Sequence, residues 1–310
     1  PMSLKTITVI GDSQSDDFNG LGVDGFRMWM PLMGNEFNAR GANTRVRCFG
    51  VSGDTTTQML ARLDDLLFYD VPTLAFIYGG VNDPANSITQ ATTQLNIEAM
   101  CMALKHGAKG TGLGNGISVS GQANLPSTGE TGQRYVVLSD TSSTGGVAAQ
   151  TPSQATTVTG SATGPTVWEY RYALAGEAGW GRVAIASTTP TYVKQIAVIS
   201  TNYLNYSTGG DTTSTPYASY VNVRAAQSAA VTSQNVNVAG IPSVVYVNLY
   251  GYQRQRIVDG KDTQGSFSWH VADSNQHHNA YGNELVKLSI FDSTYGIPTA
   301  TLNAWLAILT

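Results

Sequence analysis

Charged residues are scarce in this chain. Asp, Glu, Lys and Arg make up 12% of its 310 residues, about half of the usual quarter, and the formal net charge is −4. The sequence contains no run of Lys or Arg, which argues against a nucleic-acid partner. Ser, Thr, Asn, Gln and Gly fill the gap, and a polar surface with so little charge suits neutral, hydroxyl-rich partners better than polyanions.

Cysteines and long apolar runs are also scarce. Cys48 and Cys101 cannot form a disulfide framework, and no Cys-x-x-Cys or His/Cys cluster indicates zinc, so we expect neither a metal nor a cofactor. No apolar stretch reaches transmembrane length and no signal peptide is visible, so we expect no membrane contact. Pro1 resembles the start of a trimmed longer chain, and such a parent chain could support a homo-oligomer.

Strand-like and helix-like segments alternate in both flanks of the chain. Apolar, β-branched runs predict strands at 6–10, 45–51, 73–78, 195–200 and 243–249. Apolar residues at helical spacing predict helices at 59–67, 88–105 and 217–233, and a last helix from Glu284. This alternation is typical of parallel crossovers, so we predict an α/β fold with a three-layer α/β/α, flavodoxin-like parallel sheet.

The middle of the chain departs from this pattern. Residues 107–190 are rich in Gly, Ser and Thr and contain short alternating stretches, which predict a small antiparallel β module. Trp168, Tyr170, Tyr172 and Trp180 argue against a disordered linker. The sequence therefore predicts a discontinuous α/β domain, formed by residues 1–106 and 191–310, with the module inserted between its two parts.

Polar residues follow the first three predicted strands. Ser13 lies two residues after the first strand, in Gly11-Asp12-Ser13, while Gly53 and Asn82 follow the second and third. Because the carboxyl ends of parallel strands collect ligands and catalytic groups, Ser13 is well placed to be a nucleophile. Gly-Asp-Ser is also an ordinary turn that ends a strand, so this motif needs support from the rest of the chain.

Together with a late polar loop that carries Asp273 and His277, these segments resemble the four blocks of the SGNH (GDSL-type) hydrolase family of esterases. Gly11-Asp12-Ser13 resembles the first block, Gly53 in Ser-Gly-Asp-Thr-Thr the second, and Asn82 in Gly-Gly-Val-Asn-Asp the third. The resemblance implies a catalytic triad of Ser13, His277 and Asp273. It also implies an oxyanion hole formed by the backbone N–H groups of Ser13 and Gly53 and the side-chain amide of Asn82.

These roles agree with the chemistry of the side chains. A serine hydroxyl is a poor nucleophile until a base such as histidine takes its proton, and a carboxylate behind the imidazole fixes the ring's tautomer. The tetrahedral intermediate carries an oxyanion, which needs hydrogen-bond donors already in place. An unperturbed histidine has a pKa of about 6.5, so activity is expected to fall as the base becomes protonated.

The last block departs from the family pattern. Three residues separate Asp273 from His277, whereas the family usually has Asp-x-x-His. His277 is favoured as the base because residues 277–282 fit the family's His-x-Asn-x-x-Gly run, and His278 is the alternative. The additional residue also leaves open a serine–histidine dyad without Asp273.

The resemblance implies hydrolysis of acyl esters but does not choose the substrate. The weakly charged surface, and an inserted module that resembles carbohydrate-binding modules, favour a deacetylase of poly- or oligosaccharides. The texture of the module also resembles bacteriophage tail-spike and tail-fibre proteins, which suggests a virion tail or extracellular setting. Two alternatives are a lipase- or thioesterase-like enzyme, suggested by an apolar patch from Met28 to Met33, and a non-catalytic glycan-binding domain, suggested by the irregular Asp/His spacing.

Overall fold

We describe a computed structural model of the chain. It describes residues 4–16, 27–63, 66–67, 72–107, 118–121, 124–126, 129, 131–140, 165–172, 178–185, 190, 192–202, 215–235, 242–262 and 277–310. Asp273, which the sequence analysis proposes for the triad, lies outside the described residues.

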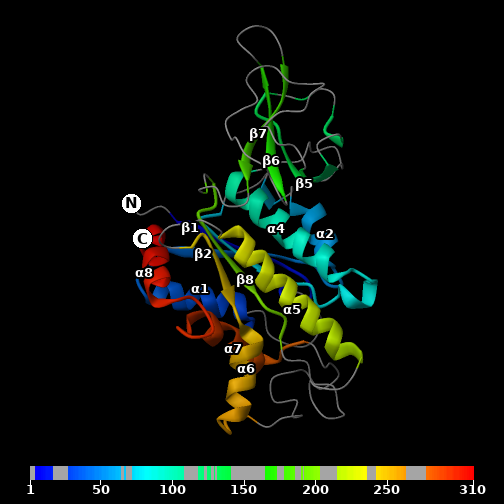
Figure 1. The fold of residues 1–310 in the computed structure, drawn as a ribbon. Coiled ribbons are helices and arrows are strands. Elements are labelled where there is room, and N and C mark those ends of the chain that lie inside the picture. The colour runs from blue at the N-terminus through cyan, green and yellow to red at the C-terminus, as the bar shows by residue number, and fades with distance from the viewer. Residues whose placement is uncertain are drawn as a thin grey trace.

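Five parallel strands form the central sheet (Figure 1). They are β1 (Lys5–Gly11), β2 (Thr44–Gly50), β3 (Leu74–Tyr78), β8 (Gln195–Ile199) and β9 (Val244–Val247), in the spatial order β2-β1-β3-β8-β9. Counted along the chain, this is the 2-1-3-4-5 order of flavodoxin-like folds. The predicted α/β fold is therefore confirmed. The strand order reverses between β1 and β3, which is where open α/β sheets form their ligand sites.

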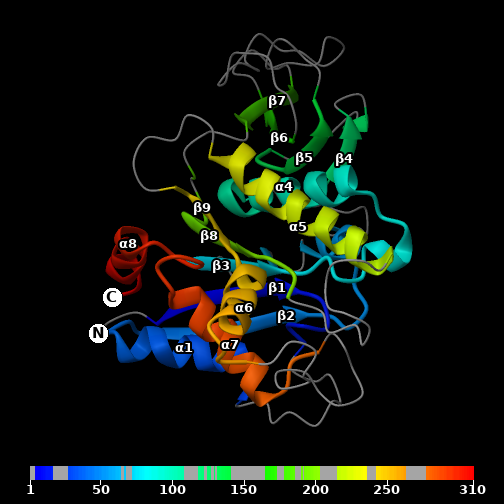
Figure 2. The same cartoon turned by 60° about the horizontal axis from the view of Figure 1, so that its bottom comes forward.

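Helices cover both faces of this sheet (Figure 2). One face carries α1 (Trp29–Ala39), α7 (Ala280–Phe291) and α8 (Thr299–Leu309), and the other carries α2 (Thr56–Ala61), α4 (Gln90–His106) and α5 (Thr215–Gln234). In β1, Ile7 and Val9 pack into the first layer and Ile10 into the second. Burial on both faces explains the nearly continuous apolar character of the strands. Among the described residues, no helix is both long and apolar enough to cross a membrane.

The second sheet is small and mixed. It contains β4 (Ser118–Gly121), β5 (Arg134–Ser139), β6 (Thr166–Tyr172) and β7 (Ala178–Ile185), in the order β4-β5-β6-β7. β5, β6 and β7 pair in antiparallel fashion, as predicted, but β4 pairs with β5 in parallel. The prediction of an antiparallel module is wrong for β4. A parallel neighbour requires the connection to return to the starting end of the sheet, and an alternating sequence pattern does not reveal that path.

The second sheet lies over α4, on the side away from the central sheet (Figures 1 and 2). The chain leaves α4 and comes back to the same place, because Tyr192 N donates to the Lys105 carbonyl at 2.8 Å and Val193 N to the Leu104 carbonyl at 3.0 Å. This geometry is compatible with an insertion at 107–190, which stays a prediction. Apolar residues of β5, β6 and β7 join the same buried cluster as α4, so the two parts share a core.

The aromatic side chains of the second sheet are largely buried. Trp168 and Trp180 are 0% exposed and Tyr170 is 5% exposed. They pack with Leu125, Tyr135 and Val137 in a cluster of their own. The described aromatic side chains of the module therefore pack its own core.

The region that follows β9 differs from the predicted elements. The predicted strand 243–249 ends at Val247, and a helix that was not predicted, α6 (Leu249–Val258), begins at once. The Asn248 side chain caps α6 by accepting a hydrogen bond from Gly251 N at 2.9 Å. The apolar patch from Met28 to Met33 is core, since Met28, Trp29, Met30 and Met33 are each at most 3% exposed.

Candidate active site

The turn after β1 holds Ser13 in a fixed position. Ser15 N donates to the Asp12 carbonyl at 2.9 Å, and Gln14 N donates to Asp12 Oδ1 at 2.9 Å. The strand can end this close to β3 only because residue 11 is glycine, since a Cβ at Gly11 would lie 2.4 Å from the Tyr78 carbonyl oxygen. Ser13 is 4% exposed. The nucleophile candidate therefore lies on a rigid turn at the carboxyl edge of the sheet.

The histidine candidate approaches from the other end of the chain. His277 Nε2 lies 2.9 Å from Ser13 Oγ, across 264 residues of sequence. Two residues later Asn279 caps α7 by accepting a hydrogen bond from Gly282 N at 2.9 Å. This cap lies at the start of α7, so His277 is in the segment that leads directly into that helix. The structure thus brings together the serine and the favoured histidine.

The neighbouring histidine has a different partner. His278 Nε2 lies 3.0 Å from the Tyr78 hydroxyl, and His278 is 4% exposed. Tyr78 is the last residue of β3, so this bond attaches the segment that carries His277 to the central sheet. Burial, with a further contribution from the Asp12 charge, raises the pKa of Tyr78 well above its usual value, which keeps the phenol protonated.

The second block supplies a backbone turn. Gly53 has φ +85°, a left-handed conformation that favours glycine. A Cβ added at Gly53 would meet no protein atom within 4 Å, so the backbone angle rather than crowding within the protein explains this glycine. The next residue, Asp54, donates its N–H to the Val51 carbonyl at 3.2 Å.

The third block is connected to the second. Asn82 Nδ2 donates to the Asp54 carbonyl at 2.9 Å. A side-chain amide has two N–H hydrogens, so this bond orients the group and leaves a second donor for a ligand. Gly53 and Asn82 therefore lie on adjoining turns at the edge that carries Ser13.

Two residues that the sequence analysis did not assign to the site hold these turns. Asp83 is 0% exposed and accepts hydrogen bonds from Thr56 N at 2.8 Å and from the hydroxyls of Thr56 and Thr93 at 2.6 Å each. Arg62 donates to three acceptors on the turns and strand ends of the first two blocks. No motif marks Arg62. Asp83 is the last residue of the third block, Gly-Gly-Val-Asn-Asp, but the sequence analysis gave it no role.

Asp12 is the most perturbed acid of the site. Burial raises its pKa to about 7, although hydrogen bonds from the backbone of Gln14, Val81 and Gly80 oppose that rise, and the nearby charge of Asp83 adds to it. Its carboxylate oxygens accept from Gln14 N and, at 3.2 Å, from Gly80 N. Asp12 thus braces the Ser13 turn and also attaches it to the turn of Asn82.

The described residues contain no group of three or more His, Cys, Asp or Glu side chains that could hold a metal ion. The site instead offers a hydroxyl, an imidazole within hydrogen-bond distance of it and amide donors on adjoining turns. Such an arrangement can activate a serine and stabilise an oxyanion.

An α/β sheet that carries this set at its carboxyl edge has the architecture of a serine hydrolase. Residues 9–144 match the family described as GDSL-like Lipase/Acylhydrolase. The matched segment includes Ser13, Gly53 and Asn82, but not His277. Over this segment, which is less than half of the chain, the sequence is similar to GDSL-like lipases and acylhydrolases.

One curated protein and two solved structures are similar to this chain. Esterase TesA of Pseudomonas aeruginosa is 36% identical over 108 residues, which are 34% of this chain and 52% of the relative. The chain thus spans about half the length of this relative. The lipase/acylhydrolase from Enterococcus faecalis superposes with a TM-score of 0.52 at 14% identity, over 99% of this chain and 98% of its own. LAE5, an alpha/beta hydrolase from the metagenome of Lake Arreo, has a TM-score of 0.52 at 11% identity, over 99% and 96%. The two structures support the fold alone.

Proposed function

We propose that this protein is a serine esterase in which Ser13 attacks the acyl carbon and His277 acts as the base. The 2.9 Å approach of His277 Nε2 to Ser13 Oγ is the observation that carries this proposal. The imidazole takes the hydroxyl proton as the Oγ–carbon bond forms, and then gives it to the departing alcohol. Water, deprotonated by the same ring, then attacks the acyl-enzyme and releases the acid and Ser13.

The backbone N–H groups of Ser13 and Gly53 and the Asn82 amide are proposed to bind the oxyanion. Two observations support this role. All three donors lie on turns that follow neighbouring strands, and the hydrogen bond from Asn82 Nδ2 to the Asp54 carbonyl orients the Asn82 side chain. Asp273 remains the proposed third member of the triad. A dyad of Ser13 and His277 is the alternative.

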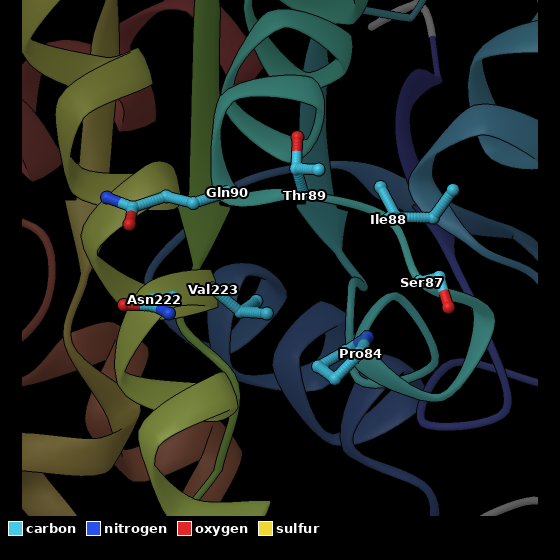
Figure 3. Close-up of a pocket in the computed structure, with 7 residues that line it drawn as sticks. All are labelled: Pro84, Ser87, Ile88, Thr89, Gln90, Asn222 and Val223. Atoms are coloured by element: carbon cyan, nitrogen blue, oxygen red, sulfur yellow. The ribbon is translucent and has the colours of Figure 1, made fainter.

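We further propose that the substrate is an acylated carbohydrate, with acetyl as the acyl group. Besides the low charge of the chain, a pocket of about 350 Å³ supports this substrate class (Figure 3). The pocket begins two residues after Asn82, and none of the described residues that line it is charged: Pro84, Ser87, Ile88, Thr89, Gln90, Asn222 and Val223. Four of these side chains can exchange hydrogen bonds with hydroxyl groups, and the apolar ones can pack against a sugar ring.

The structure weakens the expectation that the inserted module binds the sugar by aromatic stacking. Trp168 and Trp180 are fully buried and Tyr170 almost so, and they cannot stack on a ligand in this arrangement. A carbohydrate-binding role at 107–190 therefore needs other surfaces of the module. The bacteriophage tail setting is a proposal from composition alone.

A lipase-like esterase is the second candidate, and the similarity to Esterase TesA favours it. The apolar patch from Met28 to Met33, which suggested this candidate in the sequence, supports it less. Its side chains Met28, Trp29, Met30 and Met33 are packed into the core. Trp29, in the middle of that patch, donates its indole N–H to the Gln14 carbonyl at 3.0 Å and supports the nucleophile turn from below.

The experiment compares three substrates with purified protein: p-nitrophenyl acetate, p-nitrophenyl palmitate, and an O-acetylated polysaccharide from which released acetate is measured. The proposal expects turnover of the first and third and little of the second. The opposite preference would favour the lipase-like reading. A failure to hydrolyse any short-chain ester between pH 6 and 9 would favour the non-catalytic glycan-binding reading.

Matched variants test the residue assignments. Ser13→Ala is expected to abolish turnover without unfolding the protein, whereas Ser15→Ala, which removes another buried serine hydroxyl of the same turn, should retain it. His277→Ala should cost on the order of 10⁶-fold in kcat. His278→Ala should cost far less, because its ring bonds Tyr78. Equal losses in the two histidine variants would refute the assignment of the base.

A further inference from the structure

Arg62 lies at the carboxyl end of α2 and contacts the first two blocks of the site at once. Its Nε donates to Asp54 Oδ2 at 2.5 Å, one terminal nitrogen donates to the Phe49 carbonyl at 2.6 Å, and the other donates to the Gly11 carbonyl at 2.6 Å. Gly11 ends β1, Phe49 lies at the end of β2, and Asp54 belongs to the Gly53 turn. One planar group thus joins three separate segments.

The third block is attached to this cation through Asp54. The carboxylate of Asp54 binds Arg62, and its carbonyl oxygen accepts the hydrogen bond from Asn82 Nδ2 at 2.9 Å. A continuous set of contacts therefore runs from the strand end before Ser13, through Arg62 and Asp54, to Asn82. These are the segments that carry the three proposed oxyanion donors.

The strength of these contacts comes from their charge and from their partial burial. The Arg62 and Asp54 side chains are 23% and 11% exposed, respectively. Charge-assisted hydrogen bonds are roughly twice as strong as neutral ones, and a guanidinium offers its donors in a rigid fork. A lysine ammonium, a point charge on a flexible stem, cannot match three acceptors that lie in three directions.

We propose that Arg62 is a positioning residue for the esterase reaction, which holds the turns of Ser13, Gly53 and Asn82 in the spacing that an oxyanion requires. This inference depends on the proposed function. Arg62 acts through Gly11, Asp54 and Asn82, because its three hydrogen bonds end on strand and turn atoms and not on the reacting groups. Its loss should thus weaken binding of the transition state more than binding of the substrate.

The test is the kinetics of Arg62→Met and Arg62→Lys with p-nitrophenyl acetate. Losing one oxyanion donor outright costs about 10²–10³ in kcat. Displaced donors retain part of their effect, so Arg62→Met should lower kcat by about tenfold to a hundredfold. KM should change by less than about threefold, since substrate binding in the ground state does not need the donors. Arg62→Lys should recover part of the loss.

Arg134→Met is the matched control. Arg134 also pairs with a carboxylate at 2.6 Å, that of Glu169, and the two side chains are 29% and 15% exposed. It also donates to the carbonyl of His106, at the end of α4 and away from the carboxyl edge of the central sheet. Its loss should lower the melting temperature and leave kcat on the small ester unchanged.

A double-mutant cycle with Asn82→Ala identifies the route of the effect. If Arg62 acts partly through Asn82, the double variant should lose less than the product of the two single losses. An Arg62→Met protein that melts earlier but keeps its kcat would overturn the inference. If Arg62→Met does not fold, Arg62→Lys and Asp54→Asn are judged by the same kcat criterion.

Failure of the proposed function gives a different result. If Ser13→Ala hydrolyses the ester as fast as the parent protein, the esterase assignment fails whatever Arg62 does. If Ser13→Ala is inactive while Arg62→Met retains full kcat, only the positioning role of Arg62 fails.

Discussion

Replacing Asp12 by asparagine should change how the stability of this protein depends on pH. Asp12 is 0% exposed, and burial raises its pKa from 3.8 to about 7. Asparagine has nearly the same shape and can still accept from Gln14 N, but it does not titrate. One of its positions carries an NH₂ group, which cannot accept the hydrogen bond from Gly80 N. The variant should therefore be less stable overall and also insensitive to the titration of residue 12.

The direction in which stability changes with pH follows from which state, folded or unfolded, holds the proton on Asp12. Between pH 3.8 and about 7 the folded protein keeps a proton on Asp12 that the unfolded chain has lost. The free energy of unfolding therefore falls as pH rises through this window, and the stabilising effect of protonation is gone above the folded-state pKa. Because one pH unit corresponds to about 1.4 kcal/mol, the contribution of Asp12 should decrease by about 3 kcal/mol from pH 5 to pH 8.

The assay is urea unfolding of both proteins at pH 5, 6, 7 and 8, followed by circular dichroism. Other groups titrate in both proteins, so the quantity of interest is the difference in unfolding free energy between the parent and Asp12→Asn at each pH. That difference should be largest at pH 5 and should shrink towards pH 8. A difference that stays constant across the range would show that Asp12 titrates normally, and the argument from burial would be refuted.

Three further predictions concern other contacts. Asn82→Ala should lower kcat by about 10²–10³ with a smaller change in KM, because the amide is proposed to bind the oxyanion rather than the substrate; steady-state kinetics would contradict this if only KM changed. Tyr78→Phe should lower the unfolding free energy by about 1–3 kcal/mol, since buried His278 loses its hydrogen bond to the Tyr78 hydroxyl. An unchanged unfolding free energy in urea would argue that this bond does not stabilise the fold. Arg182→Met should cost about 3–5 kcal/mol, because the Arg182–Asp140 pair at 3.3 Å is 0% exposed on both sides; a melting temperature within 2 °C of the parent would exclude this.

The strands and the three early site positions could be predicted because their signals are local. A β-branched apolar run identifies β1, and Ser13, Gly53 and Asn82 each follow a strand within a few residues. Parallel strands bring such ends to one edge whatever the details of packing. Helix α6 had no comparable signal, since its sequence of Tyr, Gln and Arg residues shows no apolar period. The parallel pairing of β4 depends on the path of a connection and was equally invisible.

The local sequence could not predict which of the two neighbouring histidines lies next to Ser13. His277 and His278 are adjacent and chemically identical, and the irregular spacing from Asp273 leaves their roles open in the sequence. In the structure, His277 reaches Ser13 and His278 reaches Tyr78, two contacts between residues far apart in the chain. The same holds for Arg62, whose three acceptors come from segments up to 51 residues away.

The sequence alone determined the sheet, the edge at which chemistry is possible and the kinds of groups that collect there, because strand propensity and the residues that follow a strand are properties of neighbours in the chain. Tertiary structure decided which imidazole meets the hydroxyl, that Trp168 and Trp180 form a core rather than a sugar-binding surface, and that one guanidinium joins the turns of the site. These outcomes depend on distances and burial between residues far apart in the chain, which no local pattern encodes.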